Sequence, residues 1–213
     1  MKTTISLLSP ATIETESLVA VVLDHAEPAP NEMGKDKKPQ LKVATTDQAV
    51  QSAAADLLAS GEVTGKSFET NLMHKPAGLK AKRLLLISGG SARKFSSYDL
   101  RRIAGTAVRT LKSRGIRSFT FITPPGISAE EAARAIVEGA HVGNFDPDYY
   151  RSDRKDQKID ELSIVASGDK SALERAAAEA GTREAIRWRF FGDLFYARGS
   201  FEGKRGNEFG AEV

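Results

Sequence analysis

A strand, a helix and a second strand follow one another between residues 82 and 123, and this unit constrains the fold more than any other feature. Residues 82–88 (KRLLLIS) are an apolar run typical of a strand buried on both faces. A helix follows Ser96, with an apolar stripe at Leu100, Ile103, Ala104, Ala107, Val108 and Leu111. Residues 117–123 (RSFTFIT) predict the second strand. Such units make right-handed crossovers between parallel strands, so we expect a parallel sheet.

The rest of the chain adds strands and helices in an alternating order. We expect strands at residues 3–8, 18–23, 67–73 and 161–167, and helices at 48–59, after Ser128, and at 170–188. Residues 25–39, rich in Pro and charge, predict a surface loop, and residues 138–155 predict a connection. The order β-β-α-β-β-α-β-α-β-α predicts a three-layer α/β/α sandwich around a mixed, largely parallel sheet.

Length and composition indicate one principal domain. The chain has 213 residues, of which 40% are hydrophobic, enough for one core. It contains no cysteine, which excludes disulfides and cysteine-based sites and favours a reducing, cytoplasmic setting. No run is long enough to cross a bilayer, so we expect a soluble protein without a membrane partner. The net charge of +3 does not by itself demand a nucleic-acid partner.

Three stretches together resemble the N-terminal domain of the leucyl aminopeptidase family of cytosolic exopeptidases. The first is KRLLLISGG followed by SSYDLRRIAGTAVRTLKSRG, and the second is AEEAARAIVEGAHVGNFDPDYYRSDRK. The third is the strand ELSIVAS with the helix leading to EAIRW. In the second stretch, residues at matching places are Glu138, Gly139, Gly143, Phe145, Tyr149 and Lys155. The resemblance covers most of residues 3–188 and implies a macro-domain-like α/β fold.

The resemblance also implies a role without chemistry. In that family the N-terminal domain packs in a hexamer and shapes access to active sites of a C-terminal domain, which binds two divalent metals (zinc or manganese) and releases N-terminal amino acids from peptides. This chain lacks that domain's lysine, its Asp/Glu ligands and its signature sequence. We therefore expect no catalytic residue, no metal and no cofactor in this chain, and no peptidase activity from it alone. The expected partners are further copies of the chain or a catalytic domain.

The resemblance divides the chain into three parts. Residues 1–168 correspond to the macro-like domain and residues 169–188 to a linker helix. Residues 189–213 depart from the family, because aromatic residues crowd among glycines with no helical or strand period. We interpret this tail as atypical, either disordered or the remnant of a frame-shifted, truncated reading frame.

One candidate site lies after the central strand. Gly89, Gly90 and Ser91 stand between a strand and a helix, where an open α/β sheet forms a ligand crevice and backbone N–H groups can meet a phosphate. This placement suggests a free-standing module for a phosphorylated ligand such as ADP-ribose. The simpler interpretation, which we favour, is that the glycines only permit a tight turn.

A second candidate site is basic. Arg93, Arg101, Arg102 and Arg109 could contact nucleic-acid phosphates, as some bacterial members of the family also bind DNA. The favoured alternative is a solvated helix face or a set of salt-bridge partners. The three histidines, His25, His74 and His141, have no metal-ligand spacing, so the sequence predicts no metal site around them.

Overall fold

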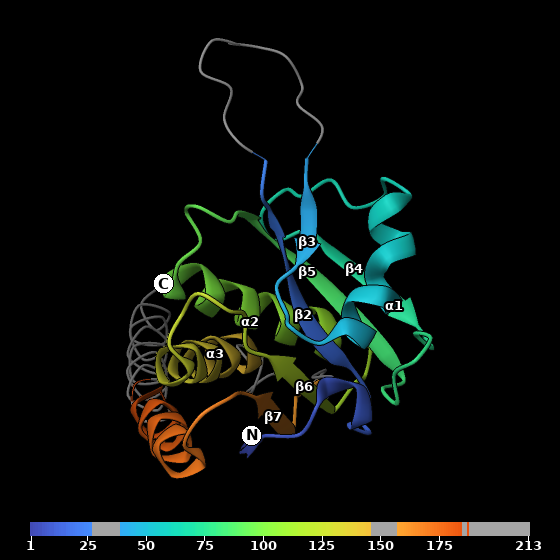
Figure 1. Cartoon of the computed structure of the whole chain (residues 1–213). Helices are drawn as coiled ribbons and strands as arrows, with labels where there is room; N and C mark the ends of the chain where they lie inside the picture. Colours follow the sequence, from blue (N-terminus) through green and yellow to red (C-terminus); the bar gives the residue numbers. More distant parts are fainter. Residues whose placement is uncertain (27–38, 146–156, 185–186, 188–213) are drawn as a thin grey trace, which may run out of the picture.

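The computed structural model describes residues 1–26, 39–145, 157–184 and 187, which form a seven-stranded sheet with helices on both faces (Figure 1). The strands are β1 (Lys2–Ser6), β2 (Leu18–Asp24), β3 (Leu41–Val43), β4 (Thr70–His74), β5 (Arg83–Ser91), β6 (Ser118–Ile122) and β7 (Glu161–Val165). The helices are the short 3-10 helix η1 (Pro10–Thr12), α1 (Gln48–Ala59), α2 (Ser97–Lys112), α3 (Ala129–Asn144) and a terminal helix over residues 170–184. The predicted α/β architecture is confirmed.

The sheet is mixed and mostly parallel. Its order is β1-β7-β6-β2-β5-β4, with β3 beside β2 but off this path. The pairs β1–β7, β7–β6, β6–β2 and β2–β5 are parallel, whereas β4–β5 and β2–β3 are antiparallel. The β5-α2-β6 unit therefore crosses from one side of β2 to the other, which is the crossover that the sequence predicts.

The central strands β2 and β5 are buried on both faces because their side chains alternate between two cores. Val19, Val21 and Leu23 of β2 face the core under α2, α3 and the terminal helix. Leu18, Ala20 and Val22 face the smaller core under α1. In Figure 1, α2, α3 and the orange terminal helix lie on one side of the sheet and α1 lies apart from them. The predicted three layers are thus present.

Local signals in the sequence place the helix starts correctly. Ser96 and Asp99 form a reciprocal capping box at the start of α2, and Ser128 accepts a hydrogen bond from the backbone N–H of Glu131 at the start of α3. The Asp47 side chain accepts hydrogen bonds from the backbone N–H groups of Ala49 and Val50 at the start of α1.

Three element boundaries and one additional strand correct the expectations. The strand β4 begins at Thr70 rather than at residue 67, because residues 67 and 68 lie in a turn where Phe68 adopts a φ of 68°. The helix α3 continues to Asn144, so the connection expected from residue 138 starts later. The strand β5 continues through Gly89 and Gly90 to Ser91, and the sequence does not predict β3.

Residues 27–38 and the tail 189–213 lie outside the described residues. None of the described helices is long and apolar enough to span a membrane.

Candidate functional site

The predicted phosphate site is part of a strand rather than a turn after it. Gly89 and Gly90 form a bulge in β5, because Val22 of β2 pairs with Ser88 while Asp24 pairs with Ser91. Gly90 has a φ of 76°, the left-handed region in which glycine is not strained. The expectation that these glycines end the strand is therefore wrong, and their backbone conformation serves the bulge.

Side chains fill the space beside these glycines. A Cβ on Gly89 would lie 2.8 Å from Cδ2 of Leu23 and 2.9 Å from the ring of Phe95. A Cβ on Gly90 would lie 2.6 Å from the hydroxyl of Ser67. These close approaches give a packing reason for glycine at both positions, which differs from the tight turn that the simpler interpretation expects. Phosphate binding at Gly89, Gly90 and Ser91 stays a prediction.

A crevice opens nearby, where β2 and β6 separate. The two strands pair only at Leu18–Thr120 and Val19–Phe121, after which β3 takes the same edge of β2. The chain crosses from β5 to β6 at this point, and open α/β sheets bind ligands outside the carboxyl ends of strands at such a switch in strand order. Two clefts of about 460 Å³ and 340 Å³ lie there and share Thr45, Pro125 and Ile127.

The charged side chains of the crevice lie in different clefts. His25 and Lys42, both exposed, line its smaller cleft. The larger cleft includes Asp47, whose carboxylate also accepts a hydrogen bond from the Ser9 hydroxyl at 2.6 Å. Burial alone would raise the pKa of Asp47, but the hydrogen bonds from Ser9 and from the N–H groups of α1 outweigh it and lower the pKa. Asp47 is therefore an ionised helix cap. The smaller cleft, which Lys42 lines, is the part of the crevice suited to an anion.

The structure places the predicted nucleic-acid residues in different local settings. Arg101 bridges Glu138 of α3 and Glu184 of the terminal helix. Arg102, its neighbour, instead stacks its guanidinium 4.2 Å from the centre of the Phe68 ring and 5.8 Å from that of Tyr98. Arg93 lies in the exposed loop after β5, and Arg109 is exposed in the last turn of α2. The salt-bridge alternative describes Arg101; for Arg93, Arg102 and Arg109 nucleic-acid contact stays a prediction.

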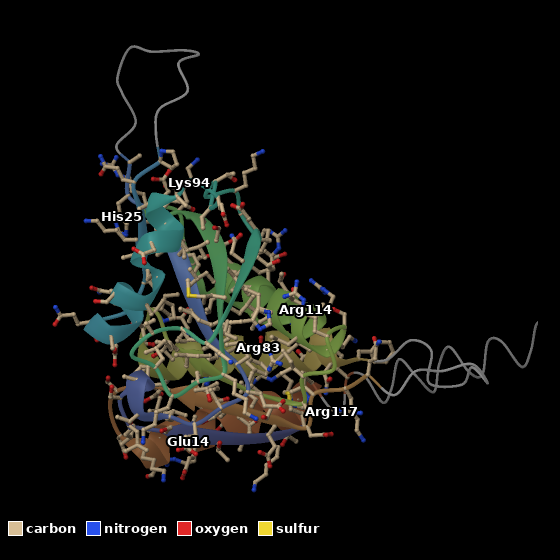
Figure 2. The ribbon with its side chains drawn as sticks, turned by 90° about the vertical axis from the view of Figure 1, so that its right-hand side faces the viewer. Glu14, His25, Arg83, Lys94, Arg114 and Arg117 are labelled. Carbon is tan, nitrogen blue, oxygen red and sulfur yellow. The ribbon has the colours of Figure 1, made fainter. Side chains whose placement is uncertain are left out.

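Other basic residues gather elsewhere. Figure 2 shows His25 and Lys94 near the top of the molecule, and Arg83, Arg114 and Arg117 below them. Arg83 donates a hydrogen bond to the backbone carbonyl of Glu16 at 3.3 Å. The Glu16 carboxylate accepts hydrogen bonds from the backbone N–H groups of Arg117 (2.9 Å) and Ser118 (3.2 Å). These bonds, that of Arg117 first, lower the pKa of Glu16, with nearby Lys82 and Arg83 adding to the effect against a smaller opposing contribution from burial. Glu16 thus ties the start of β2 to the start of β6, which no motif in the sequence indicates.

The matched motif residues of α3 face α2. Gly139 is in direct contact with the backbone carbonyl of Arg101, and a Cβ on Gly143 would lie 2.6 Å from the carbonyl oxygen of Gly105. Glu138, beside them, pairs with Arg101 at 3.5 Å. Small residues at these positions let two helix backbones approach closely. Phe145 caps the end of α3, while Tyr149 and Lys155 lie outside the described residues.

A two-metal centre needs several carboxylate or histidine ligands that converge on the ions. Residues 1–26, 39–145, 157–184 and 187 contain no group of three or more His, Asp or Glu side chains that could hold a metal ion. His25 and His74 are exposed in separate parts of the fold, and His141 lies in the last turn of α3. The described part of the chain therefore does not fit a two-metal centre, and we derive no step through one.

Comparisons by sequence and by structure both match this chain to one family of known proteins. Residues 4–154 match the N-terminal domain of the cytosol aminopeptidase family. This chain belongs to that family. A probable cytosol aminopeptidase of Acidobacterium capsulatum is 40% identical over 188 residues, and one of Koribacter versatilis is 41% identical over 198 residues. These matches cover 87% and 84% of this chain but only 36% and 37% of the two relatives, so the chain spans about a third of their length.

Solved structures show the same fold. A mutant of tomato leucine aminopeptidase superposes with a TM-score of 0.65 at 21% identity, covering 87% of this chain and 36% of that protein. A bottromycin maturation enzyme in complex with Mn superposes with a TM-score of 0.51 at 18% identity, covering 78% of this chain and 29% of that protein. The family resemblance carried by the three sequence stretches is confirmed.

Proposed function

We propose that this chain is a non-catalytic N-terminal domain of a leucyl aminopeptidase-like protein, where it serves assembly and access to the active site. The observation that carries the proposal is the use made of the matched motif. Glu138, Gly139 and Gly143 contact α2 and thereby build a helix layer instead of lining a cleft. A domain in which these motif residues serve helix packing is suited to holding other parts of an assembly in place.

The proposal assigns the chemistry to a catalytic domain outside this chain. In the parent family that domain binds two divalent metals, zinc or manganese, and releases N-terminal amino acids from peptides. The partner of this chain is then such a domain, or further copies of the chain in an oligomer, in the cytoplasm. Residues of this chain contribute by packing and by fixing the direction of the terminal helix.

A chimera tests this function. Residues 1–187 of this chain replace the matching region of the Acidobacterium capsulatum relative, and manganese-dependent hydrolysis of leucine p-nitroanilide is measured together with the mass in solution. We expect the chimera to assemble and to hydrolyse the substrate at a rate within about tenfold of the unaltered relative, since the active-site groups are unchanged and tenfold corresponds to 1.36 kcal/mol. A chimera that folds, as judged by circular dichroism, but neither assembles nor turns over substrate contradicts the proposal.

The crevice favours a second candidate function, the binding of a phosphorylated ligand. Lys42 and His25 line its smaller cleft at the position where this class of sheet binds ligands. Inorganic phosphate and ADP-ribose are the probes, and a ligand that binds only the folded chain raises its Tm. The substitution Lys42→Ala should abolish that rise and Lys66→Ala, at an exposed position outside the clefts, should preserve it. No rise in Tm with either probe rejects this function.

A further inference from the structure

One carboxylate is buried where three helices meet. Glu184 of the terminal helix is 1% exposed and is the only charged side chain among the buried residues that the structure describes. Its Oε1 accepts hydrogen bonds from Nη2 of Arg101 at 3.2 Å and from Nη1 of Arg187 at 3.1 Å. A buried carboxylate needs such partners, because an unpaired charge in the interior is very costly.

Arg101 holds a second carboxylate with its other terminal nitrogen. Its Nη1 lies 3.5 Å from Oε2 of Glu138 on α3, while Nη2 holds Glu184. Arg183 of the terminal helix approaches Oε1 of the same Glu138 at 3.9 Å. A single guanidinium on α2 is therefore shared between α3 and the terminal helix. We call Arg101, Glu138 and Glu184 the three-helix ion cluster.

Small residues bring the helices close around this cluster. Gly139, next to Glu138, contacts the backbone carbonyl of Arg101. On the terminal helix, a Cβ on Gly181 would lie 3.5 Å from Nε2 of His141 and 3.7 Å from Val137, both on α3. One turn before Glu184, the backbone of the terminal helix therefore already rests on α3. The cluster and the glycines together determine which turn of one helix meets which turn of the next.

Stability is not the best explanation for this cluster. Desolvation of buried ion pairs often cancels their attraction, and apolar replacements of similar size are frequently as stable. Apolar surfaces, however, allow a helix to slide or rotate, whereas a shared guanidinium has one geometry that satisfies both carboxylates. The same helix pair, α3 and the terminal helix, also carries an exposed ion pair, Arg134–Glu179, which lacks both burial and a shared partner.

We propose that the three-helix ion cluster fixes the register of the terminal helix on α2 and α3, and so sets the single direction in which the chain leaves the domain. Glu184 is the positioning residue, acting through Arg101. This inference rests on the proposed function, in which the domain holds a catalytic domain outside this chain in place. It concerns the domain by itself, however, and is testable without any partner.

The absence of cysteine allows a direct measurement. Cysteines introduced at the exposed positions Arg109 of α2 and Ala178 of the terminal helix take up spin labels without background, and electron resonance gives the distribution of distances between them. The cluster variant Arg101→Leu with Glu184→Leu removes the buried carboxylate together with the shared guanidinium and leaves Glu138 with Arg183. Glu184→Gln keeps the shape of the side chain and removes its charge. The control, Arg134→Leu with Glu179→Leu, removes an exposed pair that joins α3 to the terminal helix and takes no part in the cluster.

The expected results separate positioning from stability. The starting protein and the control should show one narrow distance. The cluster variant should keep its Tm but show a second distance, since a slip of one helical turn moves a label by about 5.4 Å. Glu184→Gln should broaden the distribution, because a neutral amide holds Arg101 less firmly. A single narrow distance in the cluster variant, or an equal broadening in the control, overturns the inference. Because no catalytic domain is present, this outcome does not depend on the chimera.

Discussion

The two faces of the sheet are built differently. On one face α2, α3 and the terminal helix cover a continuous core, with backbone contacts between Gly139 and α2 and a buried Glu184. On the other face α1 covers only a smaller core over the middle of the sheet, and residues of α1 and β3 line a hollow of about 880 Å³. There β1 and β7 present Lys2, Thr4 and Glu161 to solvent. The matched motif residues Glu138, Gly139 and Gly143 belong to the first face.

This difference indicates where change should matter. Parallel strands are usually covered on both faces, but Lys2, Thr4 and Glu161 of β1 and β7 are exposed. Substitutions at these positions should therefore be tolerated in the isolated chain. The tightly packed face has no spare volume, and each added atom must displace backbone. The two faces should therefore respond to mutation with clearly different magnitudes.

The largest effect is expected at Gly139. Gly139→Leu forces a side chain against the carbonyl of Arg101 and the Cβ of Ala104, which would lie 3.0 Å away, and overpacking of this kind costs about 3 kcal/mol or more. Gly181→Ala is the control, because its Cβ meets only ordinary contacts and alanine favours a helix, so stability should change by less than about 1 kcal/mol. Urea denaturation measures both. Equal losses of unfolding free energy at the two glycines would contradict the expectation that the close α2–α3 contact excludes a side chain at Gly139.

A smaller loss is expected at Glu16. Glu16→Ala removes a carboxylate from two backbone N–H groups at the start of β6 and should cost about 1.5–3 kcal/mol at neutral pH. Because the folded protein lowers the pKa of Glu16, its contribution is complete above the ordinary value of 4.5 and is lost as pH falls through the lowered value. Denaturation at pH 7 and at low pH measures this. The exposed Glu14, changed to Gln, should leave stability within about 0.5 kcal/mol.

Asp47 should show an effect of about 1 kcal/mol, the usual value for a helix N-cap. Asp47→Ala leaves the N–H groups of Ala49 and Val50 without their acceptor, whereas Asp47→Asn keeps an oxygen there. Thermal unfolding should rank the variants in that order, with Asn nearer to the starting protein. An alanine variant as stable as the starting protein would show that water replaces the cap without cost.

The smallest effect is a pH dependence at His141. Burial lowers the pKa of His141 below its ordinary 6.5, the N-terminal ammonium lowers it further, and Glu184 opposes both. The unfolded chain then binds more protons just below pH 6.5, so this contribution to stability is complete above 6.5 and falls as pH drops toward the lowered value. His141→Asn should flatten the slope of Tm between pH 7.5 and 5.5, and His25→Asn should not. An unchanged slope in His141→Asn would show that His141 does not contribute to the pH dependence of Tm.

The sequence predicts the local structure well where the signal is local. Periodicity and caps place α1 and α2, because the apolar stripe and residues such as Ser96 and Asp47 act within one turn. The strand β3 was missed because Leu41–Val43 is only three residues long and is fixed by pairing with β2. The sequence predicts a turn rather than a bulge at Gly89 and Gly90, because glycine favours both and only the pairing with β2 distinguishes them.

The site could be predicted only in part. The motif residues Glu138, Gly139 and Gly143 were identified by resemblance, but their contacts with α2 depend on how two helices meet. The crevice at Thr45 and Ile127 comes from a separation of strands that the sequence does not encode in any one stretch. In the sequence Glu184 is one of several charged residues on the terminal helix. Only its burial beside Arg101 in the structure indicates a role in positioning that helix.

The central claim, that this chain is a domain without its own chemistry, is tested most directly by an aminopeptidase assay of the purified chain. Leucine p-nitroanilide is supplied with manganese or zinc, with the Acidobacterium capsulatum relative as the positive control. The account predicts no hydrolysis above the metal-containing buffer. Metal-dependent hydrolysis that follows the chain through purification and stops on chelation would contradict it.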